Sequence, residues 1–199
     1  MIAIITGDII NSRKEDPKKW MEKLKAVLNS IGKEPKDWEI YRGDSFQVRI
    51  QPEESLRLAL RLKSAIKQYK DLDLRMAIGI GEVDYDSEKI TESNGMAFVR
   101  SGECFEALKK ETLAVRSSNK HFDKTINIML SLASLTMDSW TPSSSEIISL
   151  SLQYPDKKQT DLAKLLNKPQ SNISIGLKRG GYDEIQKLLN YYKEEISKL

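Results

Sequence analysis

The sequence has little of the chemistry on which secreted proteins and many metalloenzymes depend. Among its 199 residues there are one cysteine, Cys104, and one histidine, His121. A single cysteine excludes an internal disulfide and any zinc site built from several cysteines, and a single histidine excludes a histidine-rich metal cluster. No apolar run approaches the roughly 18 residues that a membrane-spanning helix needs. The N-terminus also lacks the basic segment and cleavage site of a signal peptide, so we expect a cytoplasmic protein without a membrane partner.

Cys104 and His121 could together form a nucleophile and its base. We interpret Cys104 instead as a small buried residue, because free cysteine usually behaves as one. His121 is interpreted as a polar residue at the start of a helix.

The net charge of +3 is too small to identify a nucleic-acid binder, but the charge is unevenly distributed. Residues 157–179 hold six basic side chains and one acidic side chain. A short basic window of this kind is typical of a surface that contacts phosphates.

The first 120 residues alternate between strand and helix patterns. Residues 2–10 form a β-branched run without helical periodicity, and residues 72–80 alternate apolar and other side chains, as strands do. Apolar residues recur at three- and four-residue steps over residues 17–31, as in amphipathic helices. The full prediction is strand 2–10, helix 17–31, a hairpin of strands 38–41 and 46–50, helix 52–69, strand 72–80, helix 97–110 and strand 112–117. This order predicts an α+β sandwich with a ferredoxin-like βαββαβ core and one added helix and strand.

Two Gly-Asp pairs fall at strand ends. Asp8 closes the first apolar run, and Asp44 lies at the tip of the predicted hairpin. Two carboxylates on neighbouring strand ends repel one another unless a cation or a shared proton lies between them. Oxygen ligands are preferred by hard divalent cations, so Asp8 and Asp44 are predicted to hold Mg²⁺ or Mn²⁺. The alternative is that each aspartate only forms an Asx turn.

Arginines accompany both aspartates in the sequence. Arg13 and Arg42 could be salt-bridge partners that replace the metal, or they could bind phosphate. The predicted nucleotide- or phosphate-binding residues are Gly7, Arg13, Arg42, Gly43 and Ser45.

Three motifs in order resemble the nucleotidyl-cyclase fold of class III cyclases and, more loosely, GGDEF-type enzymes. They are Thr6-Gly7-Asp8-Ile9-Ile10, Arg42-Gly43-Asp44-Ser45-Phe46 and Met76-Ala77-Ile78-Gly79-Ile80-Gly81-Glu82-Val83. The resemblance implies that Asp8 and Asp44 occupy the two metal-binding positions of that fold.

The sequence departs from the cyclase pattern at the positions on which catalysis would depend. The positions that carry an Asn and an Arg in cyclases are Val99 and Glu103, and the purine-selecting Lys is replaced by Ile40. A glutamate would oppose the charge of a transferring phosphate that an arginine stabilises. Arg100 could substitute only if the helix register differed. The resemblance therefore implies the fold, with metal and nucleotide binding, more than catalytic turnover.

The remaining residues are predicted to be helical. Residues 120–140 form a long helix with wide apolar faces, and residues 144–153 form a second helix that Ser143 and Glu146 would cap. A final amphipathic helix covers residues 182–199. Wide apolar faces on a linking helix indicate packing on a neighbouring element or on a second copy of the chain, and a homodimer is predicted.

Residues 159–179 resemble a helix-turn-helix. Ala163 is small where two helices would cross, and Asn167 tolerates the left-handed conformation that ends a helix. Short polar side chains at the front of the second helix suit base edges, and basic ones at its end suit phosphates of double-stranded DNA. The predicted DNA-binding residues are Gln170, Ser171, Asn172, Ser174, Lys178 and Arg179. The alternative is a helical packing domain whose polar residues are only solvated.

A cyclase-like part followed by a helix-turn-helix over nearly the whole chain resembles the SatD family. The predicted boundaries are a cyclase-like domain at 1–120, a linker helix at 121–140 and a helix-turn-helix domain at 141–199. The predicted function is a dimeric DNA-binding regulator that senses a metal-bound nucleotide or phosphate ligand. The alternatives are a metal-dependent cyclase or nucleotidyltransferase and a non-catalytic protein-interaction module.

Overall fold

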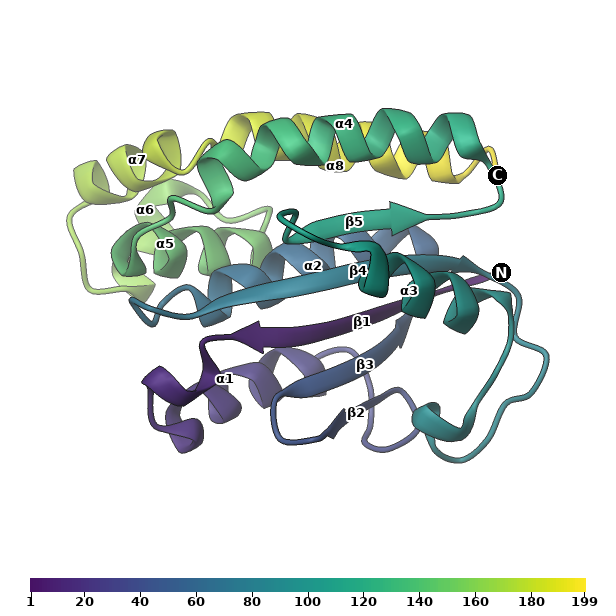
Figure 1. The fold of residues 1–199 in the computed structure, drawn as a ribbon. Coiled ribbons are helices and arrows are strands. Elements are labelled where there is room, and N and C mark those ends of the chain that lie inside the picture. Colours follow the sequence, from purple (N-terminus) through teal and green to yellow (C-terminus); the bar gives the residue numbers. More distant parts are fainter.

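A computed structural model describes all 199 residues and is built on a five-stranded sheet. The strands are β1 (Ile2–Ile10), β2 (Trp38–Tyr41), β3 (Ser45–Ile50), β4 (Asp73–Gly81) and β5 (Leu113–Arg116). Their order is β2-β3-β1-β4-β5. Neighbours are antiparallel except β4 and β5, which run parallel. β1, the most apolar and β-branched run, therefore lies at the centre (Figure 1).

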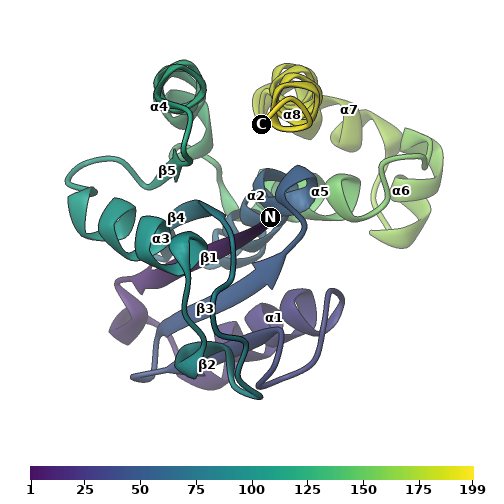
Figure 2. The ribbon, with the colours of Figure 1, turned by 90° about the vertical axis from the view of Figure 1, so that its right-hand side faces the viewer.

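Helices cover both faces of the sheet. The helices of the N-terminal part are α1 (Pro17–Asn29), α2 (Pro52–Ile66) and α3 (Met96–Ala107), with short 3-10 turns η1 (Ser12–Lys14) and η2 (Ile90–Glu92). Figure 2 shows α3 on one side of the sheet and α1 with α2 on the other. The predicted α+β class and the predicted order of elements up to residue 117 are confirmed.

The side chains of β1 alternate between the two faces of the sheet and pack against helices on both. Ala3, Ile5 and Ile9 belong to the large core that includes α1 and α2, whereas Ile4 packs with Ala97 of α3. Successive side chains of a strand point to opposite faces, and both faces of β1 are covered, so almost the whole strand is buried.

The C-terminal helices form a further layer on α2. They are α4 (Lys120–Met137), α5 (Pro142–Gln153), α6 (Gln159–Leu165), α7 (Gln170–Arg179) and α8 (Tyr182–Ile196). A hydrophobic cluster of 34 buried residues runs from the sheet through α2 into α4, α5 and α8. None of the helices combines the length and the apolar character that crossing a bilayer requires. The domain boundaries at 120 and 140 stay a prediction, and the apolar core is continuous across them.

The start of α5 differs from the prediction. The helix begins at Pro142, and its cap is Thr141, whose hydroxyl accepts from the backbone N–H of Ser144 while the Ser144 hydroxyl accepts from the backbone of Thr141. The prediction of Ser143 with Glu146 as the capping pair is wrong. Proline is favoured in the first helical turn, and a serine at the third helical position does what glutamate does in the usual capping box.

A network of charged groups around the buried Lys63 joins the sheet to the α4–α5 junction. The Lys63 side chain is fully buried, and its Nζ lies 2.6 Å from Asp73 Oδ1 and 2.9 Å from Asp138 Oδ1. Lys67 Nζ lies 3.0 Å from Asp73 Oδ2 and donates to the Asp138 carbonyl at 2.8 Å. The network therefore connects α2, the start of β4 and the end of α4.

Candidate functional site

The two predicted aspartates lie at the same end of the sheet. In β1, Asp8 stands opposite Ser45 of β3 and Arg75 of β4. Asp44 lies in the β2–β3 turn, and its carbonyl accepts a hydrogen bond from the Ile9 N–H at 3.2 Å. The sequence prediction that residues 8 and 44 meet at one rim is therefore reproduced by the backbone.

The carboxylates of Asp8 and Asp44 each accept hydrogen bonds from another side chain of the protein. Arg75 donates to both Asp8 oxygens, with Nη2 at 2.7 Å from Oδ2 and Nε at 3.3 Å from Oδ1. The same guanidinium lies 4.6 Å from the ring centre of Phe105 in α3. Asp44 Oδ2 accepts from Ser12 Oγ at 2.6 Å. Two-point ion pairs of the Asp8–Arg75 kind fix geometry as well as charge.

Neither of the two arginines near the aspartates in sequence is the salt-bridge partner. Arg13 follows β1 in η1, and Arg42 lies in the hairpin turn, and both side chains are exposed. The alternative that they pair with the aspartates is wrong, because Arg75 in the next strand faces Asp8 directly and Asp44 accepts from Ser12. Their role as phosphate ligands stays a prediction.

The β2–β3 hairpin is closed by a tight turn, whose left-handed residues include Arg42, which the sequence did not predict. Arg42 and Gly43 have φ values of 52° and 90°, as expected for a tight turn with two left-handed residues. Next to the turn, burial raises the pKa of Tyr41, with Asp8 adding to the shift and Arg42 opposing it. Tyr41 stands opposite Ser45 in the adjacent strand, so it extends the polar row that begins with Arg75 and Asp8.

The charges at this rim favour an anion over a bare cation. Two carboxylates are offset by Arg75, and Arg13 and Arg42 carry two further positive charges on the flanking segments. No group of three acidic, histidine or cysteine side chains is placed to hold a metal ion. A divalent cation between Asp8 and Asp44 would have to displace the guanidinium from Asp8. The metal site stays a prediction.

The cyclase-like positions on α3 make contacts of their own. Glu103 pairs with Arg116 at 2.9 Å, and Val99 is exposed. Arg100 Nη1 donates to the Ile80 carbonyl at 2.6 Å. Ile80 lies five residues along β4 from Arg75, which corresponds to about 17 Å at the usual rise of a strand. Arg100 therefore belongs to the other end of the sheet and does not substitute for the missing arginine.

Cys104 and His121 do not meet. Cys104 is buried in α3, and burial raises the pKa of its thiol to about 11. His121 is exposed in the first turn of α4, whose cap is Asn119. The interpretation of Cys104 as a small buried residue and of His121 as a helix-start residue is confirmed.

Helices α5, α6 and α7 form a compact three-helix group, here called the α5–α7 unit. Its core consists of the buried residues Ile147, Leu162, Ala163, Ile173 and Leu177. A Cβ added to Gly176 of α7 would lie 2.4 Å from Ile147 Cδ1 of α5, so the two helices cross closely. Ala163, the residue predicted to lie where two helices cross, belongs to this core.

The turn between α6 and α7 follows the predicted chemistry. Asn167 has a left-handed φ of 49°, and the Lys168 N–H donates to the Ala163 carbonyl at 3.0 Å. Pro169 then precedes the first residue of α7. All six residues predicted to contact DNA are exposed on α7: Gln170, Ser171, Asn172, Ser174, Lys178 and Arg179.

The family model described as the SatD family matches residues 1–190. The chain belongs to the SatD family. A search of curated proteins found no match. In this SatD-family chain the match runs through the rim, the shared core and the α5–α7 unit, so the family covers both parts rather than one of them.

Two rim residues of the SatD-family chain were missed by the sequence reasoning. Arg75 occupies the polar side of β4 and Tyr41 ends β2, and either could have been found from the alternation of its strand. Assigning Arg75 to Asp8 additionally requires the pairing of β1 with β4, which is a long-range property of the sheet.

Proposed function

We propose that this SatD-family protein is a DNA-binding transcriptional regulator whose helices α6 and α7 act as a helix-turn-helix. The observation that carries the proposal is the exposed face of α7, which combines short polar side chains at its start with two basic residues at its end. In helix-turn-helix proteins the N-terminal part of the second helix contacts base edges in the major groove. Asn172 would read a base, because asparagine pairs well with adenine. Arg179 would contact phosphate.

The proposal includes a homodimer formed through α4. Ile128, Leu132 and Leu135 are exposed by 53%, 64% and 78%, and their spacing places them on one stripe of the helix. A groove between α4 and α8 runs beside this stripe and is lined by Leu132 and Glu184. Lys124 lies near the N-terminal end of the stripe, and Glu184 lies near its other end. A second copy related by a two-fold axis would bring Lys124 of one copy toward Glu184 of the other, and such a dimer would present two copies of α7.

The N-terminal part of the proposal is a cyclase-like sandwich that senses a phosphate-containing ligand, such as a metal-bound nucleotide, at the Asp8–Asp44 rim. The closeness of the two aspartates and the positive charge of Arg13 and Arg42 support it. Arg75 would then hold the rim closed in the absence of the ligand.

Measurements of sequence-specific DNA binding test the proposal that α6 and α7 act as a helix-turn-helix. Asn172→Ala is expected to weaken binding to the selected site about tenfold or more, because a lost base contact costs ~1–3 kcal/mol. Arg179→Ala is expected to weaken binding to all sequences and to reduce the salt dependence by about one ion. The measurement is a gel-shift and footprint series on selected genomic fragments over a range of salt.

Asn190→Ala on α8 and Lys70→Ala after α2 are the matched controls, since both residues are exposed and lie outside the α5–α7 unit. Two protected half-sites one helical turn apart would support the dimer. Binding that shows no sequence preference and is unchanged by Asn172→Ala and Arg179→Ala would rule out the proposed helix-turn-helix.

Metal binding at the rim is tested by removing the competing guanidinium. Arg75→Met is expected to raise the affinity for Mn²⁺ at least tenfold, because Asp8 would then carry an uncompensated charge beside Asp44. Mn²⁺ binding is followed by electron paramagnetic resonance, with Arg116→Met, which breaks only the surface pair with Glu103, as the control. If neither wild type nor Arg75→Met binds Mn²⁺, the metal is removed from the proposal.

A further inference from the structure

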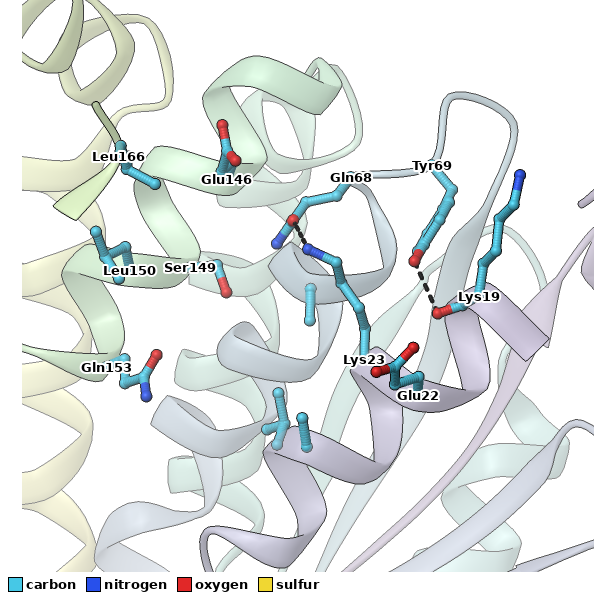
Figure 3. A pocket seen from close by; sticks show the side chains of 13 residues that line it. Lys19, Glu22, Lys23, Gln68, Tyr69, Glu146, Ser149, Leu150, Gln153 and Leu166 are labelled. Carbon is cyan, nitrogen blue, oxygen red and sulfur yellow. Dashed lines mark hydrogen bonds between the residues drawn. The ribbon is translucent and has the colours of Figure 1, made fainter. Parts of the chain in front are cut away.

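A cleft of about 580 Å³ lies between the sheet part and the α5–α7 unit. One wall is α1, the floor is the end of α2, and the opposite wall is α5 with Leu166 beyond α6 (Figure 3). Both α1 and α5 lie against α2, but no hydrogen bond or ion pair joins α1 to α5. The volume falls within the ~300–1,000 Å³ typical of small-molecule sites.

The cleft is lined by two lysines and two glutamates, and one of the glutamates has a cationic partner outside the lining. Lys19 and Lys23 lie on the α1 wall, and neither has a carboxylate within ion-pair distance. Lys23 Nζ points across the cleft to the side-chain carbonyl of Gln68, a neutral acceptor (Figure 3). On the opposite wall, Glu146 is already paired with Lys168. Glu22 has no ion-pair partner, so the unpaired charges of the lining are two lysines and one glutamate.

A third cation lies beside the same floor. Arg61 is one helical turn before Ala65 on α2, and its Nη2 donates to Ser30 Oγ, just past α1, at 3.0 Å. Burial lowers the pKa of Arg61, and the like charge of Arg57 one turn away lowers it further. An anion nearby would relieve both effects.

The rest of the lining is apolar or neutral. Ala26, Val27 and Ala65 form the lower part, and Leu150 and Leu166 face them from the other side. The amino group of Lys19 points away from the α5 wall, whereas that of Lys23 lies over the floor (Figure 3). A ligand with a negative charge near Lys23 and an apolar or flat body against these side chains would therefore fit. An inorganic anion alone would leave the apolar surface uncovered.

We propose that this cleft binds a small organic anion and, by touching α1 on one wall and α5 on the other, links its occupancy to the placement of the α5–α7 unit. The regulatory half rests on the proposed DNA-binding function, whereas the binding half does not. The site is separate from the Asp8–Asp44 rim, because none of its lining residues belongs to β1 or to the β2–β3 turn.

Fluorescence titration of the full-length protein tests the binding half with two probes of similar shape. Anilinonaphthalene sulfonate carries a negative charge, and N-phenylnaphthylamine is neutral. Lys19→Met/Lys23→Met is expected to weaken binding of the sulfonate about tenfold or more and to leave the neutral probe unaffected. The control is Lys109→Met/Lys110→Met, which removes two exposed lysines just after α3, away from the cleft and from the proposed dimer contact.

Ala26→Trp supplies a second test that does not depend on charge, because Ala26 is exposed on α1 and lines the cleft. The indole is expected to block both probes with little effect on folding. Sulfonate binding that survives Lys19→Met/Lys23→Met, or probe binding that survives Ala26→Trp, would overturn the site.

The regulatory half is tested by repeating the DNA titration with saturating sulfonate. A change of threefold or more in DNA affinity that is absent from Ala26→Trp is the expected result. Unchanged DNA affinity with normal probe binding would overturn the coupling and leave the site. Complete absence of DNA binding would overturn the proposed function without touching the probe titrations.

Discussion

Replacing Gly79 with alanine is expected to lower the free energy of unfolding by about 3 kcal/mol, although the change adds a single methyl group. A Cβ at this position would lie 2.2 Å from the Ser101 nitrogen and 2.3 Å from the Ala97 oxygen. Both are backbone atoms of α3, so no side-chain rotation can relieve the contact. Either α3 must move off β4 or the strand must bend, and the interior is too densely packed to absorb such a shift at low cost.

The measurement is denaturant unfolding of the two proteins with the same probe. Gly102→Ala on α3 is the control, because a Cβ there has nothing within 4 Å. Alanine is favoured over glycine within a helix by up to ~1 kcal/mol, so this variant is expected to be as stable as wild type or more stable. Equal stability of Gly79→Ala and wild type would mean that α3 does not pack this closely on the sheet.

Gly79 also shows what the sequence reveals and what it leaves open. The run around Gly79 and Gly81 is visible as part of a strand and as a family-like pattern. The physical reason for the glycines is the backbone of α3, which crosses β4 and would clash with a Cβ at either position. That helix begins 15 residues after Gly81, and strand alternation says nothing about how closely it approaches.

Local signals in the sequence were sufficient for most element boundaries. Asp16 accepts from the Lys18 N–H at the start of α1, and Asn167 is left-handed at the end of α6, as its residue type predicts. Such features depend on a few neighbouring residues. The C-terminal ends of helices were less well predicted, since α1, α2, α3, α4 and α8 each end two or three residues before the predicted end. Helix ends depend on packing as well as on periodicity.

Only part of the candidate site could be predicted, because the rest depends on residues that are far apart in the sequence. Asp8 and Asp44 stand out because each follows a glycine at a strand end. The partner of Asp8 is 67 residues away in the sequence, and its identity depends on which strand lies beside β1. Likewise, the apolar faces of α5 and α8 were predictable, but their shared partner, α2, was not.

Replacing Lys63 with methionine is the second change with a large expected effect. Methionine fills much of the same volume, but Asp73 and Asp138 lose a shared cation that lies within 3 Å of both. Removing one member of a buried ion pair costs ~3–5 kcal/mol. Lys67 remains beside Asp73, and Asp138 is partly exposed, so we expect a loss of about 3 kcal/mol, at the lower end of that range. Lys70→Met, at an exposed position after α2, is expected to change the stability little.

The same variant tests whether the chain unfolds as one unit. Lys63 lies on α2, between the sheet and the C-terminal helices, and its network reaches the end of α4. If the continuous core makes unfolding cooperative, hydrogen exchange of the slowest amides in β1 and in α5 should accelerate by the same factor. Asp138→Asn added to Lys63→Met should restore part of the lost stability, because Asp138, unlike Asp73, has lost its ion-pair partner and its charge is then removed. Acceleration confined to α4 and α5 would show instead that the C-terminal helices unfold separately, as the predicted boundary near residue 140 implies.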